Sequence, residues 1–311
     1  MPELRGCGMV TRMRRQRLWA DAALLGLAAG WGGTFVMVKE ATQLLPVFTF
    51  LALRFVVGSI VLIGLSRSNL RRLDRRTIVI SIVAGLLFAS AYGFQTIGLQ
   101  TIGPGRAGFI TGLAVVLVPI GAAVIWRRRP DVSAFVGIAA AVTGVAFLTG
   151  GLSGETPTLG DLWVLLGTIG FAGQLLAVGA LPRNNDPRPL AAIQVTTTAI
   201  ACALIAAITE RPVWTLDWRV WGAVLFTGLI VTALGVTAQT WAQAFTSPTH
   251  TALIFATEPV FAAVIGFLAI GEQLTFGQLV GGALILLGML ISELGPLWLN
   301  RRRAQKRALS L

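Results

Sequence analysis

The sequence has few of the residues that a soluble protein places on its surface. Charged residues fill only 12% of its 311 positions, whereas hydrophobic residues fill 55% and the mean hydropathy is +0.78. A soluble domain carries about twice that share of charge and needs more polar surface to cover its core. The composition therefore excludes an ordinary soluble domain and predicts an all-α, polytopic membrane protein.

Residues that build common catalytic and metal sites are also scarce. The chain has two cysteines, Cys7 and Cys202, and one histidine, His250, so neither a disulfide framework nor a metal site is expected. The motifs HExxH, GxSxG and Walker A are missing, which argues against a metalloprotease, a hydrolase and ATP-driven transport. No cofactor is predicted, and a membrane enzyme or scaffold stays only as an alternative.

The net charge of +12 does not predict a nucleic-acid partner, because of where the charges lie. Arginines cluster at the chain ends and in short gaps between apolar runs, without interleaved aromatic residues. Twenty Lys and Arg residues fall in alternate gaps and both tails, against four in the other gaps. This bias predicts a multi-pass cell-membrane protein with both termini in the cytoplasm.

Ten apolar runs are long enough to cross a bilayer, which takes about 20 residues as a helix. The gaps between them are too short for a soluble domain, and basic tails are predicted at 1–19 and 296–311. The ten runs are 20–38, 46–65, 78–100, 105–126, 133–151, 160–181, 189–208, 219–243, 249–270 and 276–295.

The two halves of the chain repeat one another, with five runs in each repeat (20–151 and 159–295). A shift of 140 residues places Gly30 on Gly170, Trp31 on Phe171, Arg54 on Gln194 and Pro119 on Pro259. An odd number of spans per repeat inserts the second copy the other way up. Such inverted repeats are typical of secondary transporters, whose substrate site lies near the midplane between the repeats.

Four stretches carry a resemblance to a known family: GWGGTFVMVKE, FLALRF, GRAGFITGLAVVLVP and EPVFAAVIGFLAIGEQLTFGQLVGGALILLGM. With them the sequence resembles the EamA-type transporters of the drug/metabolite transporter superfamily. The resemblance implies ten helices in two inverted repeats. It also implies export or exchange of small metabolites such as amino acids, or of toxic compounds. A Glu-Pro pair is frequent in that family at the position of Glu258 and Pro259.

Glu258 and Pro259 lie about halfway through an apolar run, where an ionised carboxylate costs about 2.5–3.5 kcal/mol. Glu258 is therefore expected to face a cavity, pair with a cation or carry a proton. The alternative is a structural hydrogen bond that fixes a kink. Pro259 and Pro119 each remove a backbone donor, so both helices are expected to kink and to flank a cavity.

Arg54 is the one cation within a predicted span, also near mid-depth. It is expected to attract either Glu258 or a substrate carboxylate. Alternatively, its stem extends along the bundle so that the guanidinium reaches interfacial water or caps a helix.

A set of further side chains outlines a polar lumen, although each one alone is equally consistent with helix–helix packing. The set is Trp31, Tyr92, Gln95, Thr111, Gln174, Gln194 and Gln239. The runs 133–151 and 276–295 carry few polar residues and are predicted to be peripheral. Glycines of the GLAAG run (26–30) are expected to allow close packing within the bundle, and a homodimer is left open.

Together these features predict a secondary transporter, expected to export small organic metabolites by alternating access. Coupling to protons through Glu258 and uncoupled facilitation remain alternatives. The bilayer and a small-molecule substrate are the expected partners.

Overall fold

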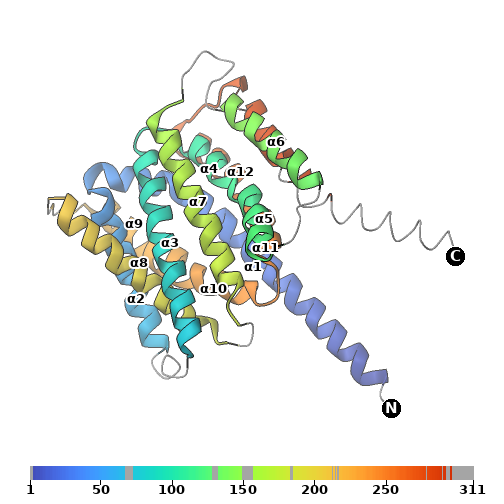
Figure 1. Ribbon diagram of the computed structural model, residues 1–311. Coiled ribbons are helices and arrows are strands. Elements are labelled where there is room, and N and C mark those ends of the chain that lie inside the picture. The colour runs from blue at the N-terminus through green and yellow to red at the C-terminus, as the bar shows by residue number, and fades with distance from the viewer. Residues whose placement is uncertain are drawn as a thin grey trace.

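In the computed structural model the chain is a bundle of helices (Figure 1). The structure describes residues 3–66, 73–127, 132–148, 157–182, 185–211, 213, 215, 217–277, 279–288, 290, 291 and 295. Every regular element in these ranges is a helix. The elements are α1 (Glu3–Leu44), α2 (Val47–Ser66), α3 (Arg75–Leu99), α4 (Pro104–Gly112), α5 (Ala114–Ile125), α6 (Val132–Leu148), α7 (Leu159–Gly179), α8 (Pro187–Thr209), α9 (Trp218–Phe226), a π-helix η2 (Thr227–Leu234), α10 (Gly235–Gln243), α11 (Pro248–Phe255) and α12 (Glu258–Ile270).

Eight helical stretches are long and apolar enough to cross a membrane, and all eight coincide with predicted spans. Shorter apolar helices, 135–144 and 279–288, occupy the two remaining predicted spans. The all-helical membrane architecture is therefore confirmed, while the full count of ten spans stays a prediction.

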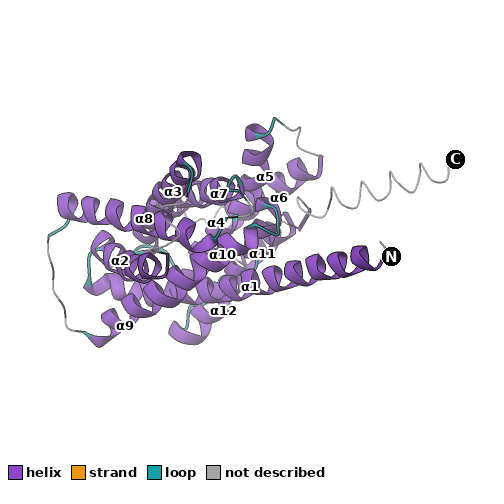
Figure 2. Ribbon diagram, turned by 90° about the horizontal axis from the view of Figure 1, so that it is seen from below, coloured by secondary structure: helices purple, strands orange, loops and turns teal. Residues whose placement is uncertain are grey.

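Helix α1 differs from its prediction, because it begins at Glu3 rather than near residue 20. Residues 3–19 are mostly good helix formers, and no proline separates them from the apolar run, so nothing stops the helix at the expected boundary. Two views show this N-terminal part of α1 projecting away from the bundle (Figures 1 and 2). The predicted C-terminal tail, 296–311, lies outside the described residues.

The helices of the two halves pack in pairs that exchange under a two-fold relation. Helix α3 packs on α7, and its counterpart is the packing of α10 on α1. Helices α11 and α12 pack on α1, just as α4 and α5 pack on α7. The contact of α2 with α8 is its own counterpart, and the contact of α4 with α12 corresponds to that of α11 with α5. The bundle core thus lies between the repeats rather than within each one.

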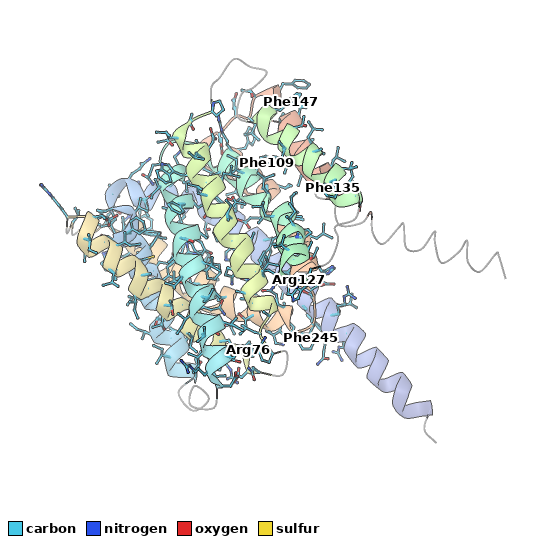
Figure 3. The ribbon with its side chains drawn as sticks, in the orientation of Figure 1. Arg76, Phe109, Arg127, Phe135, Phe147 and Phe245 are labelled. Carbon is cyan, nitrogen blue, oxygen red and sulfur yellow. The ribbon has the colours of Figure 1, made fainter. Side chains whose placement is uncertain are left out.

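Helix α6 lies at the edge of the bundle, in agreement with the prediction for 133–151 (Figure 1). It packs on the segment 279–288, where a Cβ added to Gly144 would lie 2.6 Å from the carbonyl oxygen of Gly281. Phe135 and Phe147 project from α6 at this edge, and the Phe135 side chain is exposed (Figure 3).

Two predicted spans are interrupted, but the interruptions lie ahead of the prolines that were expected to cause the kinks. The first span breaks at Leu113 and then continues as α5, which contains Pro119. The second breaks at 256–257, and Pro259 stands in the first turn of α12. Proline fits this first turn because the N–H it lacks has no partner there. Pro259 therefore starts a new helix, whereas Pro119 lies inside one.

Candidate solute cavity

A cavity lies between the halves, at the level of the two interruptions. Helices from both repeats line it. Its polar and charged walls contain eight of the nine predicted site residues: Trp31, Arg54, Tyr92, Gln95, Thr111, Gln174, Gln239 and Glu258. Gln194, the ninth, lies behind this wall. The remaining wall is mainly apolar and aromatic, with Phe35, Phe88, Phe171 and Phe255 among its residues.

Arg54 is the most buried charged residue in the described part of the chain, with only 2% of its surface exposed. Its guanidinium carbon lies 4.7 Å from the ring centroid of Tyr92 and 5.2 Å from that of Phe55. Its Nε donates to the hydroxyl oxygen of Thr232, 3.0 Å away. Aromatic faces and the hydroxyls of Thr232 and Tyr92 thus stabilise the cation.

The π-helix η2 supplies the acceptors that the sequence did not reveal. It brings the Thr232 hydroxyl to Arg54, and the carbonyl of Val231 accepts from the Trp31 indole at 3.3 Å. In a π-helix each N–H bonds to a carbonyl five residues back, which widens the turn and shifts side chains relative to an α-helix. No proline or glycine pattern marked this segment as unusual in the sequence.

Glu258 lies in the first turn of α12, so it stands at the N-terminus of a half-helix inside the bundle. The helix dipole stabilises a negative charge at such a terminus. Helix α1 crosses here closely: a Cβ on Gly32 would lie 2.8 Å from the carbonyl oxygen of Glu258. By contrast, nothing lies within 4 Å of Gly26 or Gly30, so the expectation of close packing at GLAAG was wrong.

Arg54 and Glu258 line one cavity but do not form an ion pair in the described part of the chain. Arg54 instead donates to Thr232, whereas Glu258 stands in the first turn of α12. Of the two partners expected for Arg54, Glu258 is therefore not the one bound in this conformation, and a substrate carboxylate stays a prediction. Two opposite charges facing one cavity can instead contact a solute that carries both.

The buried amides form a ladder behind the cavity. Gln239 donates to Gln174 at 3.0 Å, and Gln174 donates to Gln194 at 3.1 Å. Gln239 also donates to Gln243 at 3.3 Å, and its own carbonyl oxygen has no partner among the described residues. Gln194 therefore positions Gln174, while Gln174 and Gln239 face the cavity.

Gln95 and Thr111 form a separate pair on the first-repeat side. The Gln95 amide donates to the Thr111 hydroxyl at 2.9 Å, which in turn donates to the carbonyl of Ala107. Both side chains are held before any solute enters, as expected of a preformed binding surface.

Two kinds of lining residue were missed in the sequence. Thr34 faces the cavity one helical turn beyond Trp31, and its hydroxyl donates to the Trp31 carbonyl at 2.7 Å. Phe171 faces Tyr92 at 5.0 Å between ring centroids. The repeat alignment held the signal for Phe171, since it is the counterpart of Trp31.

Comparison with known protein families shows which family has this two-repeat architecture. The profile of the EamA-like transporter family matches residues 18–150 and 158–294, once for each predicted repeat. The chain belongs to this family. The resemblance noted from the sequence is thereby confirmed, together with the two-repeat architecture and membership of the drug/metabolite transporter superfamily.

Relatives of this EamA protein are named as transporters. An uncharacterized transporter of Archaeoglobus fulgidus is 30% identical over 279 residues, 90% of this chain and 87% of the relative. The uncharacterized transporter YoaV of Bacillus subtilis is 23% identical and spans 84% of this chain and 92% of YoaV. These names support a membrane transporter.

A protein of known crystal structure shares the fold of this EamA protein. It superposes with a TM-score of 0.65 at 20% sequence identity, covering 88% of this chain and 96% of the other. At this identity the likeness shows the fold alone.

Proposed function

We propose that this EamA protein is a secondary transporter that exports a small organic solute by alternating access, with Glu258 as the proton-coupling group. The cavity between the repeats carries this proposal, because it presents one buried cation and one carboxylate from opposite halves.

The solute class follows from the walls. Arg54 offers a positive charge, Glu258 a carboxylate, and the aromatic residues an apolar surface. A solute with an apolar body and at least one charged group satisfies all three, as many amino acids and amphipathic toxic compounds do. Gln174 and Gln239 add amide contacts that orient such a solute.

Proton coupling follows from the placement of Glu258. A carboxylate in a cavity at membrane depth is expensive when ionised, so solute entry and proton loss compete for it. The start of α12 stabilises the ionised form, whereas the apolar surroundings favour the protonated form. Such opposed influences suit a group that changes protonation during a cycle.

An uncoupled facilitator is the second candidate, favoured by the lack of an ion pair between Arg54 and Glu258. A glutamate that keeps its proton throughout would serve only as a hydrogen-bond donor to the solute. Transport would then continue down the solute gradient at a rate independent of the proton gradient.

Flux measurements test the proposal. Metabolite levels in cells with and without the protein would first identify the exported solute. Proteoliposomes loaded with that solute would then be assayed with and without a pH gradient. We expect the gradient to accelerate flux in the wild type, and Glu258→Gln to remove this dependence while the protein stays folded.

A matched control uses Glu40→Gln, which neutralises an exposed carboxylate on α1 outside the cavity. This variant should keep full gradient dependence. Gradient-independent flux in the wild type would favour the facilitator, and no solute movement at all would contradict transport.

A further inference from the structure

In the described part of the chain, two contacts between a basic and an acidic side chain join the repeats. Arg106 on α4 holds Asp161 on α7 through two bonds, Nε to Oδ1 at 2.7 Å and Nη2 to Oδ2 at 2.6 Å. His250 on α11 faces Asp21 on α1, with 2.9 Å between Nε2 and Oδ1. Each pair has one member in the first repeat and one in the second.

These pairs occupy equivalent positions of the two repeats. Pro104 and Pro248 begin α4 and α11, and the basic partner follows two residues later in both helices. The acidic partners, Asp21 and Asp161, are separated by the repeat offset of 140 residues. With both termini in the cytoplasm, as the charge bias predicts, the Arg106–Asp161 pair lies at the outer end of the bundle. The His250–Asp21 pair then lies at the inner end.

The two pairs differ in strength. The side chains of Arg106 and Asp161 are 10% and 7% exposed, and both guanidinium bonds are short. Those of His250 and Asp21 are 29% and 31% exposed, with a single bond. Removing one partner of a buried pair leaves an unpaired charge and destabilises strongly, whereas partly exposed pairs contribute little.

The outer pair has a second support beside it. Glu272, which follows α12, accepts from the backbone N–H of Gly105 at 2.9 Å, next to Arg106. Glu272 thus caps α4, the helix-end role that its loop position suggests. The second repeat therefore holds the start of α4 through two carboxylates, Asp161 and Glu272.

Both pairs lie on the helices that line the cavity. Arg106 is five residues before Thr111, and His250 is five residues before Phe255, so each lies about 7.5 Å along its helix from a cavity wall. Their partners stand on α7 and α1, which carry Phe171 and Trp31 to the cavity. Separating either pair would move cavity walls apart at one end only.

We propose that these pairs are the outer and inner gates of the transport cycle, and that the Arg106–Asp161 pair keeps the outer end closed in this conformation. The inference rests on the proposed function, since a gate presupposes alternating access. The stronger outer pair biases the resting protein toward opening at the inner end, where only one partly exposed bond must break.

Cysteine accessibility tests the gates without any knowledge of the solute. Cys7→Ser and Cys202→Ala remove the native thiols, and Thr34→Cys places a single thiol in the cavity wall. A membrane-impermeant maleimide is then added to right-side-out or inside-out vesicles. The labelling rate reports which end is open.

Arg106→Gln should raise the labelling rate from outside by about tenfold or more, with a lower rate from inside. His250→Gln should raise the rate from inside by about two- to fivefold, without an increase from outside. Arg106→Lys keeps the charge but loses the two-bond geometry, so its labelling should be intermediate.

Equal rises from both sides would mean general loosening and would overturn the proposal, as would unchanged labelling. If both Arg106 variants fail to fold, Asp21→Asn and His250→Gln decide it, because unchanged labelling from inside contradicts an inner gate. Opposite shifts in labelling without solute flux would support the gates while refuting the proposed transport function.

Discussion

The two halves of this EamA protein share one scaffold but divide the charges of the cavity between them. Arg54 of the first half has the neutral Gln194 as its counterpart at the 140-residue shift. Glu258 begins α12 as Ala114 begins α5, although the 140-residue shift would place it on Val118, so its counterpart is uncharged in either register. A cavity on the shared axis is lined by both copies, so duplicating each charge would place like charges in one confined space. Like charges disfavour ionisation of both groups. The comparison teaches that the helices of the two repeats pack in equivalent ways, whereas the charged residues of the cavity are not repeated.

The largest effect is expected at the close crossing of α1 and α12. Gly32→Leu places a side chain against the backbone of α12, so we expect about 3 kcal/mol less stability, because a backbone oxygen cannot move aside. The second half has Ala172 at the equivalent position, where a Cβ is already accommodated. Unfolding in mixed detergent micelles would measure the loss.

Gly30→Leu is the matched control for this crossing. It lies two residues away on the same helix, is exposed, and has no atom within 4 Å of an added Cβ. Equal stability of the two variants would contradict a tight crossing at Gly32.

The next effect concerns the partner of Arg54. Thr232→Val removes the hydroxyl that accepts from the Arg54 Nε, and we expect a loss of about 2 kcal/mol because hydrogen bonds to charged groups are strong. Thr227→Val in the same π-helix breaks only a bond to Ala223 within its own helix and should cost less. Comparable losses in the two variants would show that Arg54 does not depend on Thr232.

A smaller effect should separate the amide ladder from the cavity wall. Gln194→Leu removes an amide behind the wall, so we expect a loss of about 1 kcal/mol or less with little change in transport. Gln239→Leu changes the wall itself and should raise the KM for the solute. If Gln194→Leu raises the KM as strongly, the ladder is itself part of the binding surface.

The smallest effect compares equivalent helix caps. Asp74 caps α3 and Asp217 caps α9, 143 residues apart in the two repeats. The Thr77 hydroxyl and backbone N–H donate to Asp74 and hold the pKa of that carboxyl below its usual range. A lowered folded-state pKa contributes stability above the unfolded value near 3.9, and this contribution is lost as the pH falls through the lowered pKa.

Asp74→Ala should therefore lower the Tm slightly at neutral pH, and its Tm should converge with that of the wild type under acidic conditions. Asp217→Ala, which loses a single bond to Arg219, serves as the counterpart. A constant difference in Tm down to low pH would contradict a role for the ionised Asp74.

Much of the fold could be predicted because the hydropathy of each segment and the positions of its glycines are local properties of the sequence. The apolar runs matched seven of the eight helical spans within a few residues, while α1 extends beyond its run at both ends. The repeat offset predicted which helices are equivalent. Eight of the nine predicted site residues line one cavity, since polar side chains within apolar spans must avoid lipid. Their part in solute binding remains a prediction.

The breaks in the helices could not be placed in this way. Proline predicts that a helix is disturbed nearby, but packing against other helices determines which turn is interrupted. The interruption therefore lies at Leu113, ahead of Pro119. The π-helix at 227–234 carries no local signal, because it depends on contacts with α2 and α1 that only the assembled bundle provides.

The amino-acid sequence by itself determined a membrane-spanning helical bundle built from two repeats, in which Arg54 and Glu258 are kept away from lipid. It could do so because burial of apolar surface and the cost of charge in hydrocarbon act on each segment separately. Only the tertiary structure decided that Arg54 binds Thr232 rather than Glu258, and that the two inter-repeat ion pairs differ in burial. Those outcomes depend on distances between residues far apart in the chain, which arise only when the two halves pack against each other.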